Sequence, residues 1–200
     1  MACKNEPYDS LMKIAKARKS WRSFAEAAVS EEEIQKIINL ATLSPYASGR
    51  KNWKIKAVND PEIIAQAAEV VNRRCVLLSA DVRCDMQEAF KSYAENFVVF
   101  KKAPVLLYTE FRVAPALSLM IENNESIKAW ERDNFVKSIA GVTMMVLLAA
   151  EALDLAACCM TGPLLAQDEL AALFNIKETK EIGAIIALGH KPKEKADDGK

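Results

Sequence analysis

Histidine is the scarcest chemically useful side chain in this sequence, because the 200 residues contain only His190. The five cysteines, at positions 3, 75, 84, 158 and 159, are odd in number and form no paired Cys-x-x-Cys motif. The sequence therefore argues against a disulfide framework, and it has too few suitably spaced Cys and His ligands for a zinc site. We expect reduced, mostly buried thiols and no metal site.

The formal net charge is zero, because 27 Lys and Arg residues balance 27 Asp and Glu residues. No overall electric field therefore attracts nucleic acid or a membrane surface. The N-terminal residues lack the apolar stretch of a signal peptide. The most apolar run, Ile139 to Ala150, has twelve residues, whereas a membrane span needs about 20. We predict a soluble, cytoplasmic protein with no nucleic-acid or membrane partner.

What the sequence does have is the composition of a folded domain, with 51% hydrophobic and 27% charged residues. It contains no repeat, low-complexity segment or linker, so we expect a single domain over residues 1–200. Hydrophobic periodicity and capping signals predict helices at 8–17, 31–44, 61–72, 82–100, 133–153 and 167–174. Short apolar runs predict strands at 53–58, 104–109, 156–160 and 182–188. The fold class that follows is α+β.

The most basic stretch, residues 18–24, reads Arg-Lys-Ser-Trp-Arg-Ser-Phe and follows the first predicted helix. One guanidinium group can donate two parallel hydrogen bonds to phosphate oxygens, and a serine hydroxyl can donate to a remaining oxygen. On an extended segment, Arg18, Ser20 and Arg22 would lie on one side and Trp21 on the other. An anion site and a solvated basic turn both agree with these residues.

A second stretch, residues 44–53, connects a predicted helix to a predicted strand. Its small residues Ala47, Ser48 and Gly49 would let a planar ligand approach the backbone closely. Taken by itself, the stretch is equally typical of an ordinary loop.

A third stretch, residues 158–163, is the end of a predicted strand followed by the turn signal Thr161-Gly162-Pro163. Such a turn leaves backbone N–H groups free for a ligand atom that needs a donor. The neighbouring Cys158 and Cys159 would point to opposite faces of the strand. We therefore expect two separate thiols and no strained disulfide between them.

In this order and spacing, the three stretches resemble the nitroreductase family of FMN-dependent oxidoreductases. Residues 18–24 match the family's R-[RK]-S-x-R-x-F motif. Residues 45–53 are similar to its P-S-x-x-N-x-Q-P-W element, with Pro45 and Trp53 at the ends, and residues 187–192 resemble its closing L-G-Y-P strand end. The chain departs from the family pattern at Tyr46, Gly49, Lys51, Asn52, Met144, Met145 and Thr161.

The resemblance implies a fold, an assembly and a set of FMN contacts. It implies a mixed, mainly antiparallel central sheet surrounded by helices, in an intertwined homodimer. Arg18, Lys19 and Ser20 would hold the phosphate and ribityl end of FMN, with Lys193 and Lys195 as auxiliary phosphate ligands. Arg22 would contact the pyrimidine edge of the ring. The remaining contacts would line the ring, in part from the partner subunit, or face its N5 atom: Pro45, Tyr46, Ala47, Ser48, Met160, Thr161 and Gly162.

The implied reaction is ping-pong reduction of a nitroaromatic, quinone or similar small-molecule acceptor, with NAD(P)H as the hydride donor. Because the flavin carries the redox step, we nominate no catalytic side chain. Two other functions remain open. One is a dehalogenase or ring-modifying flavoenzyme on the same scaffold, and the other is a non-enzymatic flavin-binding module.

Overall fold

The computed structural model describes residues 5–47, 51–113, 116–121 and 123–192. Its centre is a four-stranded sheet made of β1 (Trp53–Val58), β2 (Val105–Phe111), β3 (Leu155–Met160) and β4 (Glu181–His190). The strand order is β1-β2-β4-β3, and all three pairings are antiparallel. The α+β fold with a helix-covered antiparallel sheet is confirmed, and β3 is an edge strand.

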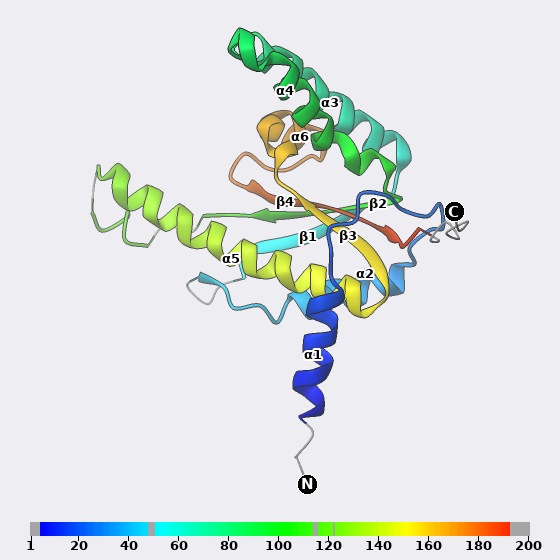
Figure 1. Ribbon diagram of the computed structural model, residues 1–200. Coiled ribbons are helices and arrows are strands. Elements are labelled where there is room, and N and C mark those ends of the chain that lie inside the picture. The colour runs from blue at the N-terminus through cyan, green and yellow to red at the C-terminus, as the bar shows by residue number, and fades with distance from the viewer. Residues whose placement is uncertain (1–4, 48–50, 114–115, 122, 193–200) are drawn as a thin grey trace.

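Helices cover both faces of the sheet, because successive strand residues point to opposite sides and both sides are apolar. On one face, α2 (Glu31–Ala41) and α5 (Glu125–Ala152) pack against residues such as Leu107 and Ile186. On the other face, α3 (Pro61–Ser79) and α6 (Gln167–Leu173) pack against residues such as Leu106 and Ile185. Figure 1 shows the sheet between these two layers.

Two helix starts follow the predicted capping chemistry. The Glu33 N–H donates to the Ser30 hydroxyl at 3.2 Å, and the Ser30 N–H donates to the Glu33 carboxylate at 2.9 Å, which closes the capping box of α2. At α3, the Glu62 N–H donates to the Asp60 carboxylate at 2.8 Å, and Pro61 occupies the first turn. The predicted end of this helix near residue 72 is wrong, because α3 continues to Ser79.

The single helix expected over residues 82–100 is wrong in detail. This stretch forms a short 3-10 turn, η2 (Cys84–Met86), then α4 (Gln87–Ala94), then a second 3-10 segment, η3 (Glu95–Lys102). In a 3-10 helix, residues three apart share a side, and here these are Phe97 and Phe100, both buried. The tighter winding therefore presents both rings to the same core.

The long helix α5 begins at Glu125, eight residues before the predicted start at 133. Its first turn is capped by the Asn124 side chain, which accepts a hydrogen bond from the Ile127 N–H at 3.2 Å. The early turns are mostly exposed, so they lack the apolar stripe on which the prediction depended. By length and composition α5 could cross a membrane. Phe135, Ile139 and Val142 are buried in the protein core, so α5 is the core helix that was predicted.

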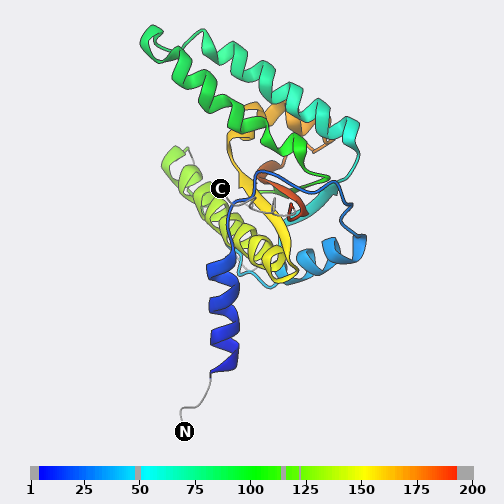
Figure 2. The ribbon, with the colours of Figure 1, turned by 45° about the vertical axis from the view of Figure 1, so that its right-hand side comes forward.

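The N-terminal helix α1 (Glu6–Ala17) has no buried residue. Tyr8 and Leu11 on this helix are 56% and 53% exposed. Figures 1 and 2 show α1 standing away from the rest of the molecule. An amphipathic helix of this kind usually gains its stability by packing its apolar side on something.

The segment before α5 is held by a buried carboxylate. The Glu131 side chain accepts hydrogen bonds from the Ala116 N–H at 2.7 Å, the Leu117 N–H at 2.6 Å and the Ser118 hydroxyl. The hydrogen bond from the Ser118 hydroxyl, followed by the one from the Ala116 N–H, lowers the pKa of Glu131. Glu131 thus ties a non-helical segment to the start of α5 as a carboxylate.

Replacing this carboxylate should give a stability change that depends on pH. The pKa of Glu131 is lower in the folded than in the unfolded protein, so its contribution is complete above the unfolded value and is lost as pH falls through the folded value. We expect Glu131→Gln to lower the free energy of unfolding at pH 7, and the deficit to shrink below about pH 4. Urea unfolding at several pH values measures this deficit. An equal deficit at pH 7 and at acid pH would show that the charge is unimportant.

Candidate functional site

The basic segment, residues 18–24, runs along the free edge of the sheet. The Trp21 N–H donates to the Ala157 carbonyl of β3 at 3.1 Å. Just beyond the segment, the Ala25 N–H donates to the His190 carbonyl of β4 at 3.0 Å. In Figure 1 this stretch is the blue connection that passes over β3. Two strands therefore fix its position.

The side chains of the segment alternate as the sequence predicted. The Lys19 ammonium lies 4.0 Å from the centre of the Trp21 ring, so these two side chains share one side. Ser20 and Arg22 instead approach Cys158 of β3. Burial raises the pKa of the Cys158 thiol, while the Arg22 charge and a hydrogen bond with Ser20 oppose that rise. Trp21 and Arg22 thus lie on opposite sides of the segment.

The cations of the segment have no carboxylate partners among the described residues. In the described part of the chain, Arg18, Lys19 and Arg22 make no ion pair. The Trp21 indole N–H is likewise buried without a hydrogen-bond acceptor among the described residues. Three unpaired cations beside a serine hydroxyl can hold a phosphate group. An oxyanion is the kind of ligand that this segment fits best.

The turn after β3 supplies unpaired backbone donors. β3 ends at Met160, which is buried, and the 3-10 turn η4 (Gly162–Ala166) follows directly. Within the described residues, the Thr161 and Gly162 N–H groups donate to no acceptor. Three residues along the strand separate Cys158 from Thr161, which is roughly 10 Å. A mononucleotide ligand with its phosphate near Ser20 could place a ring heteroatom at these N–H groups.

Position 162 has to be glycine because a side chain distant in sequence packs against it. A Cβ atom at this position would lie 2.2 Å from Cδ1 of Phe97, whose ring covers the turn. The Phe97 ring therefore leaves no space for a larger side chain at position 162. No local sequence pattern links two residues that are 65 positions apart. Their contact follows only from the packing of η3 against the turn after β3.

The loop before β1 lies on the other face of the sheet. The Tyr46 ring centre is 6.1 Å from that of Trp53 and 5.6 Å from that of Phe135, and burial raises the pKa of Tyr46 to about 12. The Ala47 N–H donates to the Ser138 hydroxyl at 2.9 Å, while Pro45 is exposed. The Tyr46 ring is thus half-buried and packs against Trp53 and Phe135 of its own chain.

One chain does not bring Pro45, Tyr46 and Ala47 together with the basic segment, because they pack beside α5 and not beside Cys158. Ser48, Lys193 and Lys195 lie outside the described residues. The cysteines expected as thiols are free at positions 75, 84, 158 and 159.

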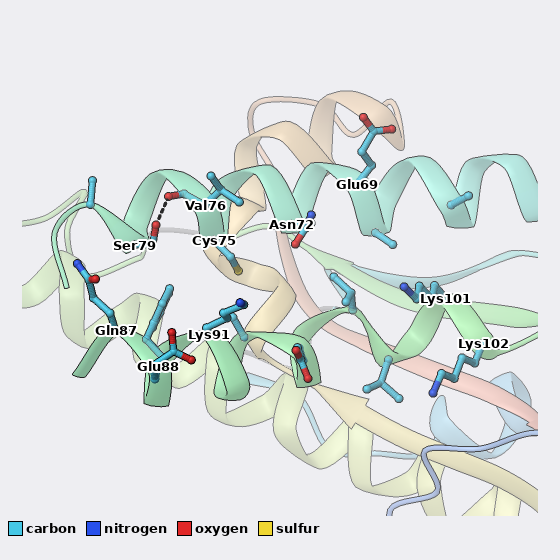
Figure 3. A pocket seen from close by; sticks show the side chains of 18 residues that line it. Glu69, Asn72, Cys75, Val76, Ser79, Gln87, Glu88, Lys91, Lys101 and Lys102 are labelled. Atoms are coloured by element: carbon cyan, nitrogen blue, oxygen red, sulfur yellow. Dashed lines mark hydrogen bonds between the residues drawn. The ribbon is translucent and has the colours of Figure 1, made fainter. Parts of the chain in front are cut away.

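A groove of about 1350 Å³ lies elsewhere, between α3 and the α4–η3 stretch, and Figure 3 shows its side chains. Apolar residues such as Val76 and Val98 line it, and Lys101 and Lys102 lie at one end. None of the predicted site residues is among those that line this groove. No group of three or more His, Cys, Asp or Glu side chains suited to a metal ion occurs among the described residues.

Known structures share this architecture. A BluB-like flavoprotein from Clostridium difficile 630 is 25% identical, with a TM-score of 0.82 over 95% of this chain and 94% of that chain. A nitroreductase with bound FMN from Desulfitobacterium hafniense DCB-2 is 19% identical, with a TM-score of 0.68 over 92% and 90%. An iodotyrosine deiodinase bound to FMN and 3-iodo-L-tyrosine is 20% identical, with a TM-score of 0.70 over 92% and 90%. A search of curated protein sequences gave no match.

The sequence profile of the Nitroreductase family matches residues 15–190. This range includes the basic segment, the loop before β1 and the turn after β3. The resemblance drawn from those three stretches is therefore confirmed, over most of the chain's length. The chain belongs to the Nitroreductase family.

Proposed function

We propose that this chain is an FMN-dependent oxidoreductase and that FMN lies along the edge of β3, in a single domain over residues 1–200. The observation that carries the proposal is the set of cations at Arg18, Lys19 and Arg22, which have no carboxylate partner in the described structure and are fixed to β3. Two solved structures of this fold hold FMN, which supports the choice of anion.

The family resemblance suggests a division of the binding residues. Arg18 and Ser20 would hold the phosphate, and Lys19, whose ammonium lies over the Trp21 ring, would add positive charge from the other side of the segment. Arg22 would lie nearer the ring, where a fixed cation favours the addition of electrons. The Thr161 and Gly162 N–H groups would donate to the ring edge.

When bound, FMN supplies the redox step, taking hydride from NAD(P)H and passing electrons to a nitroaromatic, quinone or similar acceptor in a ping-pong cycle. The chain's own residues bind and orient the cofactor, and no side chain has to act as a dedicated acid or base. One structural relative is a deiodinase, so reductive dehalogenation is the second candidate reaction. A steady-state screen with NADH, NADPH, nitroaromatics, quinones and halogenated phenols separates the two. A flavin-binding module without enzyme activity would bind FMN but leave it oxidised in the presence of NAD(P)H.

A homodimer fits two features of the chain. The apolar side of α1 is exposed, and the loop at Pro45–Ala47 is remote from the basic segment of its own chain. A second copy could cover α1 and bring its own loop to the FMN. Sedimentation equilibrium should then give twice the chain mass of 22.1 kDa. The free thiols agree with a reducing compartment, and we propose the cytoplasm.

The direct test of the cofactor is the visible absorption spectrum of the purified protein, before and after FMN is added and unbound FMN removed. We expect flavin absorbance that disappears when NADH or NADPH is added without oxygen. Protein that retains no flavin would overturn the proposal.

Two substitutions test the division of roles. Ser20→Ala should weaken FMN binding by roughly two- to tenfold, because it removes one hydrogen bond to an anion, and should leave the reduction rate of bound FMN nearly unchanged. Arg22→Ala should slow reduction by NAD(P)H roughly tenfold or more while affinity falls less. Fluorescence titration and stopped-flow absorbance measure the two quantities, with the exposed Arg73→Ala as control. If both substitutions changed affinity alone, Arg22 would belong with the phosphate group.

A further inference from the structure

The turn that carries the unpaired Thr161 and Gly162 N–H groups is covered by an aromatic ring. Phe97 of η3 is 8% exposed, and its ring lies directly over Gly162. A Cβ atom at Gly162 would meet three atoms of this ring, at 2.2, 2.6 and 2.7 Å. The aromatic ring therefore borders the place where the ring edge of FMN is proposed to lie.

A second aromatic ring extends this cover towards solvent. Tyr93, one helical turn before Phe97, lies edge-on to it, with ring centres 5.0 Å apart and an interplanar angle of 77°. Tyr93 is 63% exposed. A single exposed tyrosine needs no explanation on a protein surface. This one packs edge-on against the ring that covers the turn, and most of its own surface is left to contact something else.

The helix that carries these rings separates them from the groove of Figure 3. Phe90, Ala94 and Val98 line the groove between this stretch and α3. Tyr93 and Phe97 are absent from that lining, and Phe97 contacts the turn after β3 instead. The aromatic pair thus belongs to the β3 side of the hairpin formed by α3 and α4, which Figure 2 shows projecting from the sheet.

We propose that Tyr93 and Phe97 form an aromatic wall of the electron-acceptor pocket, and that Tyr93 determines specificity by contacting planar aromatic acceptors. The inference rests on the proposed function, because it takes the Thr161–Gly162 turn as the position of the flavin ring. Phe97 is a positioning residue that holds the turn. Tyr93 supplies an exposed aromatic surface, on which aromatic rings pack edge-on or offset.

The test compares two acids that cannot be reduced by the flavin, benzoate and cyclohexanecarboxylate. They carry the same charge and differ in aromaticity and planarity. Their dissociation constants for the FMN-loaded protein come from changes in the flavin spectrum or from calorimetry. Wild type should bind benzoate more tightly, and Tyr93→Ala should lose roughly two- to twelvefold of that preference. Tyr93→Phe should retain it, because the ring remains.

Leu77→Ala is the matched control, since Leu77 is 65% exposed on the neighbouring helix of the same hairpin. It should leave both dissociation constants unchanged. In turnover, Tyr93→Ala should lower kcat/KM for nitrobenzene by a similar factor and leave ferricyanide reduction unchanged, because ferricyanide has no aromatic ring.

The outcomes are distinct. FMN content equal to wild type, with an unchanged preference for benzoate in Tyr93→Ala, would overturn the aromatic wall and leave the proposed function intact. Equal weakening of both acids would also overturn it, because the effect would then not concern aromatic contact. A wild-type protein that binds no FMN would overturn the proposed function, and the aromatic wall with it.

Discussion

Gly162→Ala is expected to destabilise the protein by about 1–3 kcal/mol, which corresponds to a fall in Tm of roughly 2–12 °C for a chain of this size. The added Cβ would lie 2.2 Å from the Phe97 ring, and this ring is held from behind by the apolar cluster that contains Phe100 and Leu106. Neither the ring nor the turn can move without disturbing the core. Thermal and urea unfolding measure the loss.

Gly141→Ala is the matched control. Gly141 lies within α5, and the nearest atom to an added Cβ is the Ser44 hydroxyl at 3.1 Å, which a small rotation can relieve. We expect a change of no more than about 1 kcal/mol, since alanine also favours the helix. In Gly162→Ala, a further Phe97→Leu change should restore part of the loss, because the smaller side chain leaves room. If Phe97→Leu added its own cost in full, the contact with Gly162 would not be the source of the destabilisation.

Lys180→Met is expected to cost about 3 kcal/mol at neutral pH. Glu110 in β2 is 3% exposed, and its carboxylate accepts from the Lys180 ammonium at 2.6 Å. The remaining cation, Lys56, is 4.0 Å away and about half exposed, so it compensates only in part. A buried charge that loses its closest partner retains the cost of leaving water.

The exposed pair Lys36–Glu32 provides the comparison. Its atoms are 2.7 Å apart, close to the distance in the buried pair, but both side chains are more than half exposed. Lys36→Met should therefore cost less than about 0.5 kcal/mol. In the double variant Glu110→Gln with Lys180→Met, most of the loss should be recovered. A small effect of Lys180→Met alone would mean that water or Lys56 satisfies Glu110.

The features that the sequence predicted well are encoded by near neighbours. The capping box at Ser30 and Glu33 spans four residues, and the alternation of Ser20, Trp21 and Arg22 follows from an extended backbone. The apolar stripe of α5 from Phe135 onward likewise repeats at helical spacing. In each case a local rule of geometry determines the outcome.

What could not be predicted depends on contacts between distant residues. Glu110 lies just past the predicted strand, and nothing near it in sequence shows that Lys180 will pair with it. The same is true of Phe97 and Gly162, because nothing near the turn glycine in sequence shows that the Phe97 ring packs against it. The contact of Tyr46 with Phe135 likewise joins residues that lie far apart in sequence.

The strand order has a consequence for the assembly of the protein during synthesis. β4 is the last strand in sequence, yet it lies between β2 and β3 and pairs with both. Until residues 181–190 have left the ribosome, β3 has no neighbouring strand and the sheet consists of the antiparallel pair β1 and β2 alone. The basic segment depends on this late step too, because its anchors are Ala157 and His190. A nascent chain lacking β4 would therefore expose two apolar faces and present no ordered phosphate site.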